Sequence, residues 1–230
     1  MYNLIMEKII ITDIVNGMYN SSNLPNKYSN SEYNIFTNIY LKHMNMVNRM
    51  IYLNEKIEEE YNIWLKLLSE PKIDMSSPYA ILKSSEEHNA WQRKITDSVF
   101  YQEKIIMHLR RVIDDSIVLI SIVKNIFTKD KKKKLIRPFE SIGECLGEFD
   151  KFKFLEQHKD FLKLVNELSN SFKHCTVNTM ENKIGQNEPC IYVYTKGDSN
   201  FYNEIGISIN GLIRDFNYYY PTFHQIITTG

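Results

Sequence analysis

Asn166, Asn170 and His174 follow one another at four-residue intervals near the end of a predicted amphipathic helix. This spacing places side chains on one face of an α-helix, beside the apolar stripe that contains Val165 and Leu168. An imidazole can transfer protons near neutral pH, and a neighbouring amide can fix its tautomer or hold a phosphate oxygen. The same residues can instead cap the helix C-terminus, where the helix dipole favours a partly charged histidine.

Two arginines and two aspartates lie four residues apart in the middle of a predicted long helix. Arg110 with Asp114, and Arg111 with Asp115, are i, i+4 pairs, which on most helices are surface ion pairs worth about 0.3–0.5 kcal/mol. Arg110 and Asp114 also border the apolar stripe, so a partly buried Arg110 can reach a neighbouring helix and face the amides described above. A guanidinium placed there would stabilise charge on a scissile phosphate.

Apolar periodicity predicts two long helices that position these groups. Ser31 is a candidate N-cap for the first, which ends before Pro71, and the second runs from about Glu87 to Phe127. Glu58, Glu59 and Glu60 are expected on the solvated face of the first helix, at residues 58–60. Two long helices joined by a loop should pair antiparallel.

Shorter elements are expected on either side of this pair. A short helix is predicted from Leu4 to Met18, and another from Pro138 to about Leu146, where Gly147 ends it. Asp150 is expected to start the helix that carries Asn170 and His174.

The pattern changes after Cys175. Residues 190–209 contain two β-branched and aromatic segments around a Gly-Asp turn, which predicts a hairpin. Asn210 is a candidate cap for a final helix that ends before Pro221. The predicted fold is therefore mainly α, an antiparallel helical bundle with a C-terminal β-hairpin and closing helix. We expect one domain, with an N-terminal helix and link at 1–28, the bundle at 29–178, and the hairpin with its closing helix at 179–230.

Composition and charge restrict the function. The 28 Lys and Arg residues balance the 28 Asp and Glu residues, so any polyanion site must be a local patch. The basic run Lys129–Lys134 is either a solvated loop between helices or a patch that contacts RNA or a protein partner. The odd, scattered cysteines Cys145, Cys175 and Cys190 indicate reduced thiols in the cytoplasm.

Several familiar site classes are absent from the sequence. The N-terminus lacks a signal-peptide pattern, and the longest uncharged apolar run, Ser116–Val123, is too short to span a bilayer. The chain has no Glu-x-x-His or His-Glu-x-x-His metal motif, no phosphate-binding glycine loop and no Gly-x-Ser-x-Gly elbow. We therefore expect no metal, no cofactor and no membrane contact.

A helical up-and-down domain whose penultimate core helix ends in Asn-x-x-x-His resembles the HEPN superfamily, the helical domains of prokaryotic toxins and antiviral systems. Members typically carry Arg-Asn-x-x-x-His. Asn170 and His174 match this pattern, whereas Ser169 stands at the arginine position. The resemblance covers about residues 30–178.

The resemblance implies a metal-independent ribonuclease, usually a homodimer whose two motifs meet in one cleft. His174 would handle protons and Asn170 would orient phosphate. The missing cation would come from Arg110, Arg111 or Lys173, with Arg111, Lys173 and Asp114 assigned to substrate binding. The alternative is a catalytically inactive relative that binds RNA or a protein partner, such as an antitoxin or a defence component.

Overall fold

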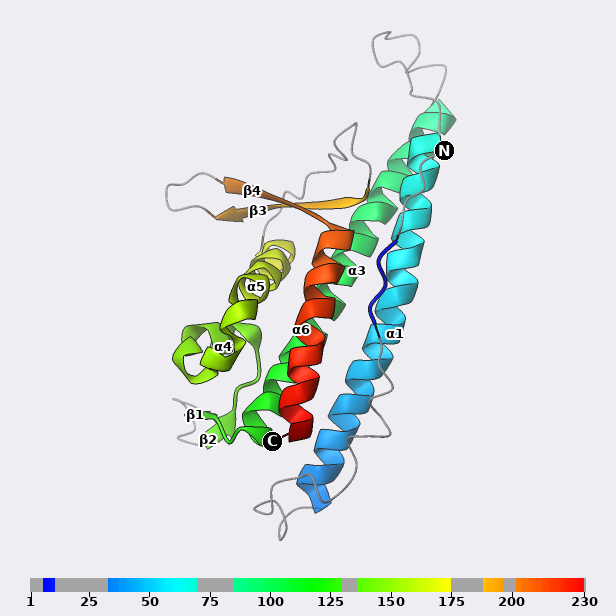
Figure 1. The fold of residues 1–230 in the computed structure, drawn as a ribbon. Helices are drawn as coiled ribbons and strands as arrows, with labels where there is room; N and C mark the ends of the chain where they lie inside the picture. The colour runs from blue at the N-terminus through cyan, green and yellow to red at the C-terminus, as the bar shows by residue number, and fades with distance from the viewer. Residues whose placement is uncertain are drawn as a thin grey trace.

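The computed structural model describes residues 6–10, 33–69, 85–129, 136–174, 188–196 and 202–229. The fold is mainly helical, with two small antiparallel hairpins and a closing C-terminal helix (Figure 1). The predicted fold class is therefore confirmed.

Two long helices form an antiparallel pair, as predicted from their apolar spacing. Helix α1 spans Tyr33–Ser69 and helix α3 spans Ser85–Val123, and the two pack along their lengths (Figure 1). Helix α3 ends earlier than the predicted Phe127, because Asn125 adopts a left-handed φ of 56° and the chain then enters a strand. Left-handed backbone stops a right-handed helix, and asparagine tolerates it well.

A small hairpin follows α3 where the sequence indicated only a loop. Strand β1 (Phe127–Lys129) pairs antiparallel with strand β2 (Ile136–Pro138), with Thr128 opposite Arg137. The rest of the predicted basic run, residues 130–134, lies outside the described residues. The prediction that Pro138 opens a helix is wrong, because Pro138 ends β2.

Helix α4 spans Ile142–Gly147. Ser141 is its N-cap, and the Ser141 hydroxyl accepts a hydrogen bond from the backbone N–H of Glu144 in the first turn. A 3-10 helix, η2, then covers Phe149–His158, and helix α5 covers Lys159–His174. The prediction that Asp150 starts the helix carrying Asn170 is therefore wrong in its boundary. Buried aromatic side chains in η2 hold the tighter coil against the core.

The C-terminal hairpin is confirmed. Strand β3 spans Cys190–Lys196, strand β4 spans Tyr202–Ser208, and the two pair antiparallel over their full length. One side of the hairpin buries Ile191 and Val193 in the core, and β3 packs on α5. This packing supplies the support that an isolated hairpin lacks in water.

The closing helix α6 spans Ile209–Thr229 and corrects two predictions. Its first turn is capped by Ser208, whose Oγ accepts from Gly211 N–H at 2.9 Å, and not by Asn210. The helix also continues through Pro221, which is exposed. An interior proline costs about 3 kcal/mol, and the buried residues on both sides of it, including Phe216, Tyr219, Phe223 and Ile226, offset that cost.

The N-terminal helix predicted for Leu4–Met18 is also wrong where the structure describes it. Residues 6–10 form neither helix nor strand and run as a stretched segment beside α1 (Figure 1). Ile9 is buried, and Met6 packs against the core. The main chain of residues 6–10 forms hydrogen bonds with side chains of α1 and α6 instead of the i→i−4 hydrogen bonds of a helix.

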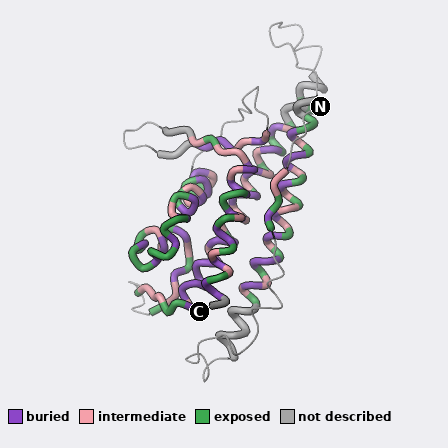
Figure 2. Tube along the Cα trace, in the orientation of Figure 1, coloured by how far each residue is buried: buried purple, intermediate pink, exposed green. Residues whose placement is uncertain are grey.

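One hydrophobic cluster joins the described elements. It draws residues from segment 6–10 and from α1, α3, α4, η2, α5, β3 and α6, and Figure 2 shows buried positions on the sides where these helices face one another. Among the described residues, no helix is both long and apolar enough to span a membrane. Helix α3 packs on α1, α4, α5 and α6, so its polar side chains meet several neighbours.

Candidate functional site

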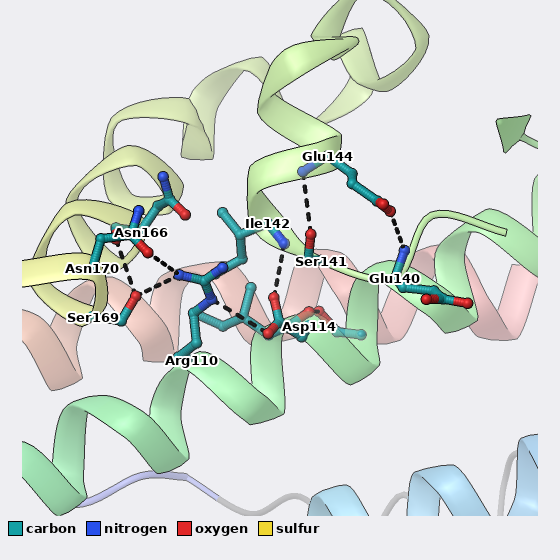
Figure 3. A network of polar contacts seen from close by, with 11 residues as sticks. Arg110, Asp114, Glu140, Ser141, Ile142, Glu144, Asn166, Ser169 and Asn170 are labelled. Carbon is teal, nitrogen blue, oxygen red and sulfur yellow. Dashed lines mark hydrogen bonds and ion pairs between the residues drawn. The ribbon is translucent and has the colours of Figure 1, made fainter. Parts of the chain in front are cut away.

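The side chain of Arg110 extends from α3 to the C-terminal part of α5, where its guanidinium contacts Ser169 and Asn170 (Figure 3). Its Nη1 donates to Ser169 Oγ and to Asn170 Oδ1, the second at 3.4 Å. Only 11% of the Arg110 side chain is exposed. The expected reach of Arg110 to the neighbouring helix is therefore confirmed as a contact, and its role in catalysis stays a prediction.

Ser169 is the residue of α5 whose hydroxyl accepts the hydrogen bond from Arg110. The residue is buried, and its hydroxyl donates to the backbone carbonyl of Asn166 at 3.0 Å. Because the hydroxyl proton is used in this way, the oxygen lone pairs are free to accept from the guanidinium. Asn166 lies beside α4, where its Oδ1 is 3.6 Å from the position of a Cβ built on Gly143.

Asp114 holds the other side of the guanidinium. Its Oδ2 accepts from Arg110 Nε at 3.3 Å, and its Oδ1 accepts from the backbone N–H of Ile142 at 2.8 Å. Burial raises the pKa of Asp114, against the opposing effects of the Ile142 N–H and of Arg110. The carboxyl thus fixes Arg110 and also satisfies an N–H in the first turn of α4.

The first turn of α4 completes this polar network (Figure 3). Glu144 accepts from the backbone N–H of Glu140 at 2.9 Å, and its carboxylate pairs with Arg137. Asp114 therefore ties the first turn of α4 to α3, while Glu144 ties the same turn to Arg137 of β2.

The remaining predicted site residues lie at the surface or outside the description. Asn170, Lys173 and Arg111 are exposed. His174 is the last residue of α5, but its side chain lies outside the described residues. The structure therefore brings together Arg110, Asp114 and Asn170.

The predicted ion pair between Arg111 and Asp115 is replaced by a different contact. Asp115 is buried and accepts from Lys42 Nζ of α1 at 2.8 Å, and 33% of the Lys42 side chain is exposed. Asp115 faces α1 because it lies along the antiparallel seam of α1 and α3, whereas Arg111 points to solvent. Local spacing suggested Arg111 as the partner of Asp115, and the packing of the two helices placed Lys42 there instead.

No family model, curated protein or solved structure matches the chain. The resemblance to the HEPN superfamily therefore depends on the motif residues Asn170 and His174.

A second polar site was missed by the sequence analysis. Glu60, expected on a solvated face, is fully buried between α1 and α3, where its Oε1 accepts from Ser98 Oγ at 2.7 Å and from Gln102 Nε2 at 2.8 Å. Burial raises the pKa of Glu60 to about 7. The spacing to Ile57 and Trp64 on the buried stripe was the available signal, since Glu60 lies three residues from one and four from the other.

Other groups that could carry chemistry are less suited to it. Burial raises the pKa of Cys145 to about 12, which keeps its thiol protonated and unreactive near neutral pH. Among the described residues, no group of three or more His, Cys, Asp or Glu side chains is arranged to hold a metal ion.

Proposed function

We propose that this chain is a HEPN-like protein of a prokaryotic conflict, stress or antiviral system, and that it cleaves RNA phosphodiesters without a metal ion. The reaction would take place at the end of α5, in a homodimer whose two sites meet in one cleft. Proton transfer is assigned to His174, phosphate orientation to Asn170 and charge stabilisation to Arg110.

The observation that carries the proposal is the contact of Arg110 with Ser169 and Asn170. In the HEPN pattern an arginine precedes the asparagine, and here Ser169 occupies that position. Arg110 brings a guanidinium from α3 to the same point on α5. A cation beside the motif's asparagine is therefore supplied from another helix instead of from the motif itself.

The surroundings of Arg110 suit the stabilisation of developing charge. A largely buried guanidinium interacts more strongly with a phosphate than one in bulk water. Asp114 fixes the orientation of the guanidinium at Nε, while Nη1 faces exposed Asn170. A phosphate approaching from the Asn170 side would find an oriented donor and, nearby on α5, the exposed Lys173.

The test is cleavage of a single-stranded RNA in the presence of EDTA. The parent chain should cut the RNA, and His174→Ala should abolish cutting with little change in thermal stability. Arg110→Lys retains the charge but not the planar fork, so cutting should fall by about 100-fold or more.

A matched pair on α5 serves as the control for RNA binding. Lys173→Ala should weaken RNA binding, whereas Lys163→Ala, which removes an equally exposed lysine earlier in the same helix, should leave it unchanged. A parent chain that binds but never cuts RNA, together with a His174→Ala variant that is less stable by more than ~1 kcal/mol, would instead assign His174 to helix capping.

A catalytically inactive RNA-binding module is the second candidate, and the seam between α1 and α3 favours it. Lys56 Nζ lies 5.0 Å from the ring centroid of Tyr52 and 5.5 Å from that of Tyr101, and Lys104 Nζ lies 5.1 Å from Tyr101. The rings of Tyr52 and His108 are 4.6 Å apart. Cations interleaved with aromatic rings are typical of surfaces that bind single-stranded nucleic acid. Here Lys104 is the exposed cation, whereas Lys56 is paired with Glu59 at 2.6 Å.

The two candidates differ in their dependence on this seam. If the chain is only a binding module, Lys104→Glu should weaken RNA binding. Neither the parent nor any variant should then cut RNA. If the chain is a nuclease, Arg110→Lys should reduce cutting while the affinity for RNA changes little.

A further inference from the structure

The main chain of segment 6–10 is bonded by asparagine side chains of α1 and α6. Asn54 of α1 accepts from Ile9 N–H at 2.8 Å and donates to Ile9 C=O at 3.1 Å. Asn217 of α6 accepts from Ile10 N–H at 3.0 Å and donates to Lys8 C=O at 2.9 Å.

A third asparagine extends this arrangement. Asn210 Oδ1 accepts from the backbone N–H of Glu7 at 2.9 Å, while its Nδ2 donates to Glu188 Oε2 at 2.8 Å. The contact with Glu188 orients the amide so that its oxygen faces the segment. We refer to Asn54, Asn210 and Asn217 as the asparagine track.

Two side chains of the segment, those of Ile9 and Met6, pack in or against the hydrophobic core. Ile9 is 3% exposed, whereas Ile10 is 60% exposed. The ion pairs of Lys8 with Glu58, at 3.5 Å, and of Glu7 with Arg214, at 3.9 Å, are between exposed side chains. Exposed pairs of this kind are weak. The track therefore recognises an amide backbone with a buried aliphatic side chain that is preceded by an acidic and a basic residue.

We infer that the asparagine track is a binding site for an extended peptide segment of a partner protein, and that residues 6–10 occupy it as a tethered competitor. Main-chain hydrogen bonds supply affinity in this mode, and the pocket that holds Ile9 supplies specificity, as in recognition by strand addition. The ligand carries an aliphatic residue at the position of Ile9, with free N–H groups at the positions of Glu7, Ile9 and Ile10. Glu58 and Arg214 favour a basic residue and an acidic residue before it.

The tethered segment is suited to displacement. The segment is held by hydrogen bonds that replace bonds to water, by the buried Ile9 and by the partly buried Met6, against the entropy lost in ordering the segment. Residues 11–32 link it covalently to α1, which raises its local concentration at the track. A separate segment that makes the same contacts and extends beyond them can therefore replace it. This inference does not depend on RNA cleavage.

The probe is a fluorescein-labelled peptide with the sequence of residues 4–12, added to the full chain. In Ile9→Asp the chain's own segment should leave the track, because a carboxylate cannot enter the apolar pocket. This variant should bind the peptide saturably in fluorescence anisotropy, and the peptide should raise its melting temperature. The affinity of the unaltered chain for the peptide should be lower by about tenfold or more, since its own segment competes.

Two controls separate main-chain recognition from general stickiness. A peptide N-methylated at the nitrogen of Ile9 lacks the donor to Asn54 and should bind about tenfold more weakly. The double variant Ile9→Asp, Asn54→Ala should also lose peptide binding. A folded Ile9→Asp chain that ignores the peptide, or equal binding of the methylated peptide, overturns the inference.

Two further outcomes are also decisive. If Ile9→Asp does not fold alone, refolding with the peptide should restore its helical circular dichroism, and failure to do so counts against the site. If the unaltered chain is a dimer that the peptide converts to monomers, the natural occupant is the segment of a second copy, which overturns a partner protein as the ligand.

Discussion

The carboxyl group of Glu60 is buried between α1 and α3 and has no cationic partner among the hydrogen bonds it accepts. It is fully buried, one oxygen accepts from Ser98 and Gln102, and the other, Oε2, is buried with no hydrogen-bond partner in the described part of the chain. A buried carboxylate with an unsatisfied oxygen is costly, which is why burial raises the pKa of Glu60 to about 7.

Glu60→Gln should remove a pH dependence of stability. The folded chain keeps the Glu60 proton up to about pH 7, whereas the unfolded chain loses it near the ordinary value of 4.5. The free energy of unfolding therefore contains a part that decreases as pH rises from about 4.5 to about 7, on the order of 3 kcal/mol in all. Glutamine does not ionise, so the variant should be more stable than the parent at pH 8, as measured by denaturant unfolding.

Glu58→Gln is the matched control, because Glu58 lies on the same helix and 58% of its side chain is exposed. Its stability should follow that of the parent at every pH. Equal effects of the two substitutions would show that Glu60 is solvated in solution.

At the scale of elements, α4 and α5 are joined to α3 by polar contacts as well as by the core. The ion pair of Arg110 with Asp114 lies on α3, Asp114 bonds to the first turn of α4, and Arg110 bonds to the end of α5. Removing one member would leave a largely buried charge without its partner, which is costly. The candidate site is thus built at the junction of three helices, which fixes its geometry.

In the C-terminal hairpin, Gly206→Ala should be destabilising. Gly206 pairs with Tyr192 across the two strands, and a Cβ at position 206 would lie 2.6 Å from Tyr192 Cε1. The ring of Tyr192 must move from its buried place, which costs about 1–3 kcal/mol. The melting temperature should fall accordingly in a thermal scan.

Gly147→Ala provides the comparison, since a Cβ at Gly147 would meet no atom within 4 Å beyond its chain neighbours and its own helix backbone. This substitution should leave stability unchanged or raise it slightly. A Gly206→Ala variant as stable as Gly147→Ala would mean that the Tyr192 ring moves aside without cost.

At the scale of the whole molecule, four histidines make the fold sensitive to acid. Burial is the largest cause of a lowered pKa for His43, His108, His158 and His224, and for His43 the value falls from 6.5 to about 4. In the unfolded chain these histidines bind protons below about pH 6.5, whereas in the folded chain they do so only at lower pH. Stability should therefore fall as pH decreases from about 6.5 to about 4.

Glu60 opposes this loss over much of the same range, because its proton favours the folded chain. Melting temperatures measured between pH 7 and pH 4.5 should therefore fall more steeply for Glu60→Gln than for the parent. A Glu60→Gln chain whose melting temperature rises on acidification would contradict the assignment of buried neutral histidines.

Local patterns were sufficient for much of the fold. The apolar spacing of Met46, Met50, Leu53 and Ile57 predicted α1 and its buried side, because a repeat near 3.6 residues creates a stripe that must be covered. Alternating β-branched and aromatic residues predicted the C-terminal hairpin in the same way. Element ends were less predictable, since α4 begins after Ser141 and not at Pro138, and α6 is capped by Ser208 and not by Asn210.

The sequence by itself determined the helical class, the hairpin and the row of amides on α5, since each depends on residues close together in the chain. Only the tertiary structure decided that Asp115 pairs with Lys42, that Glu60 is buried and that Arg110 meets Asn170. The physical reason is that a long polar side chain has several partners within local reach, and the packing of helices distant in sequence selects among them.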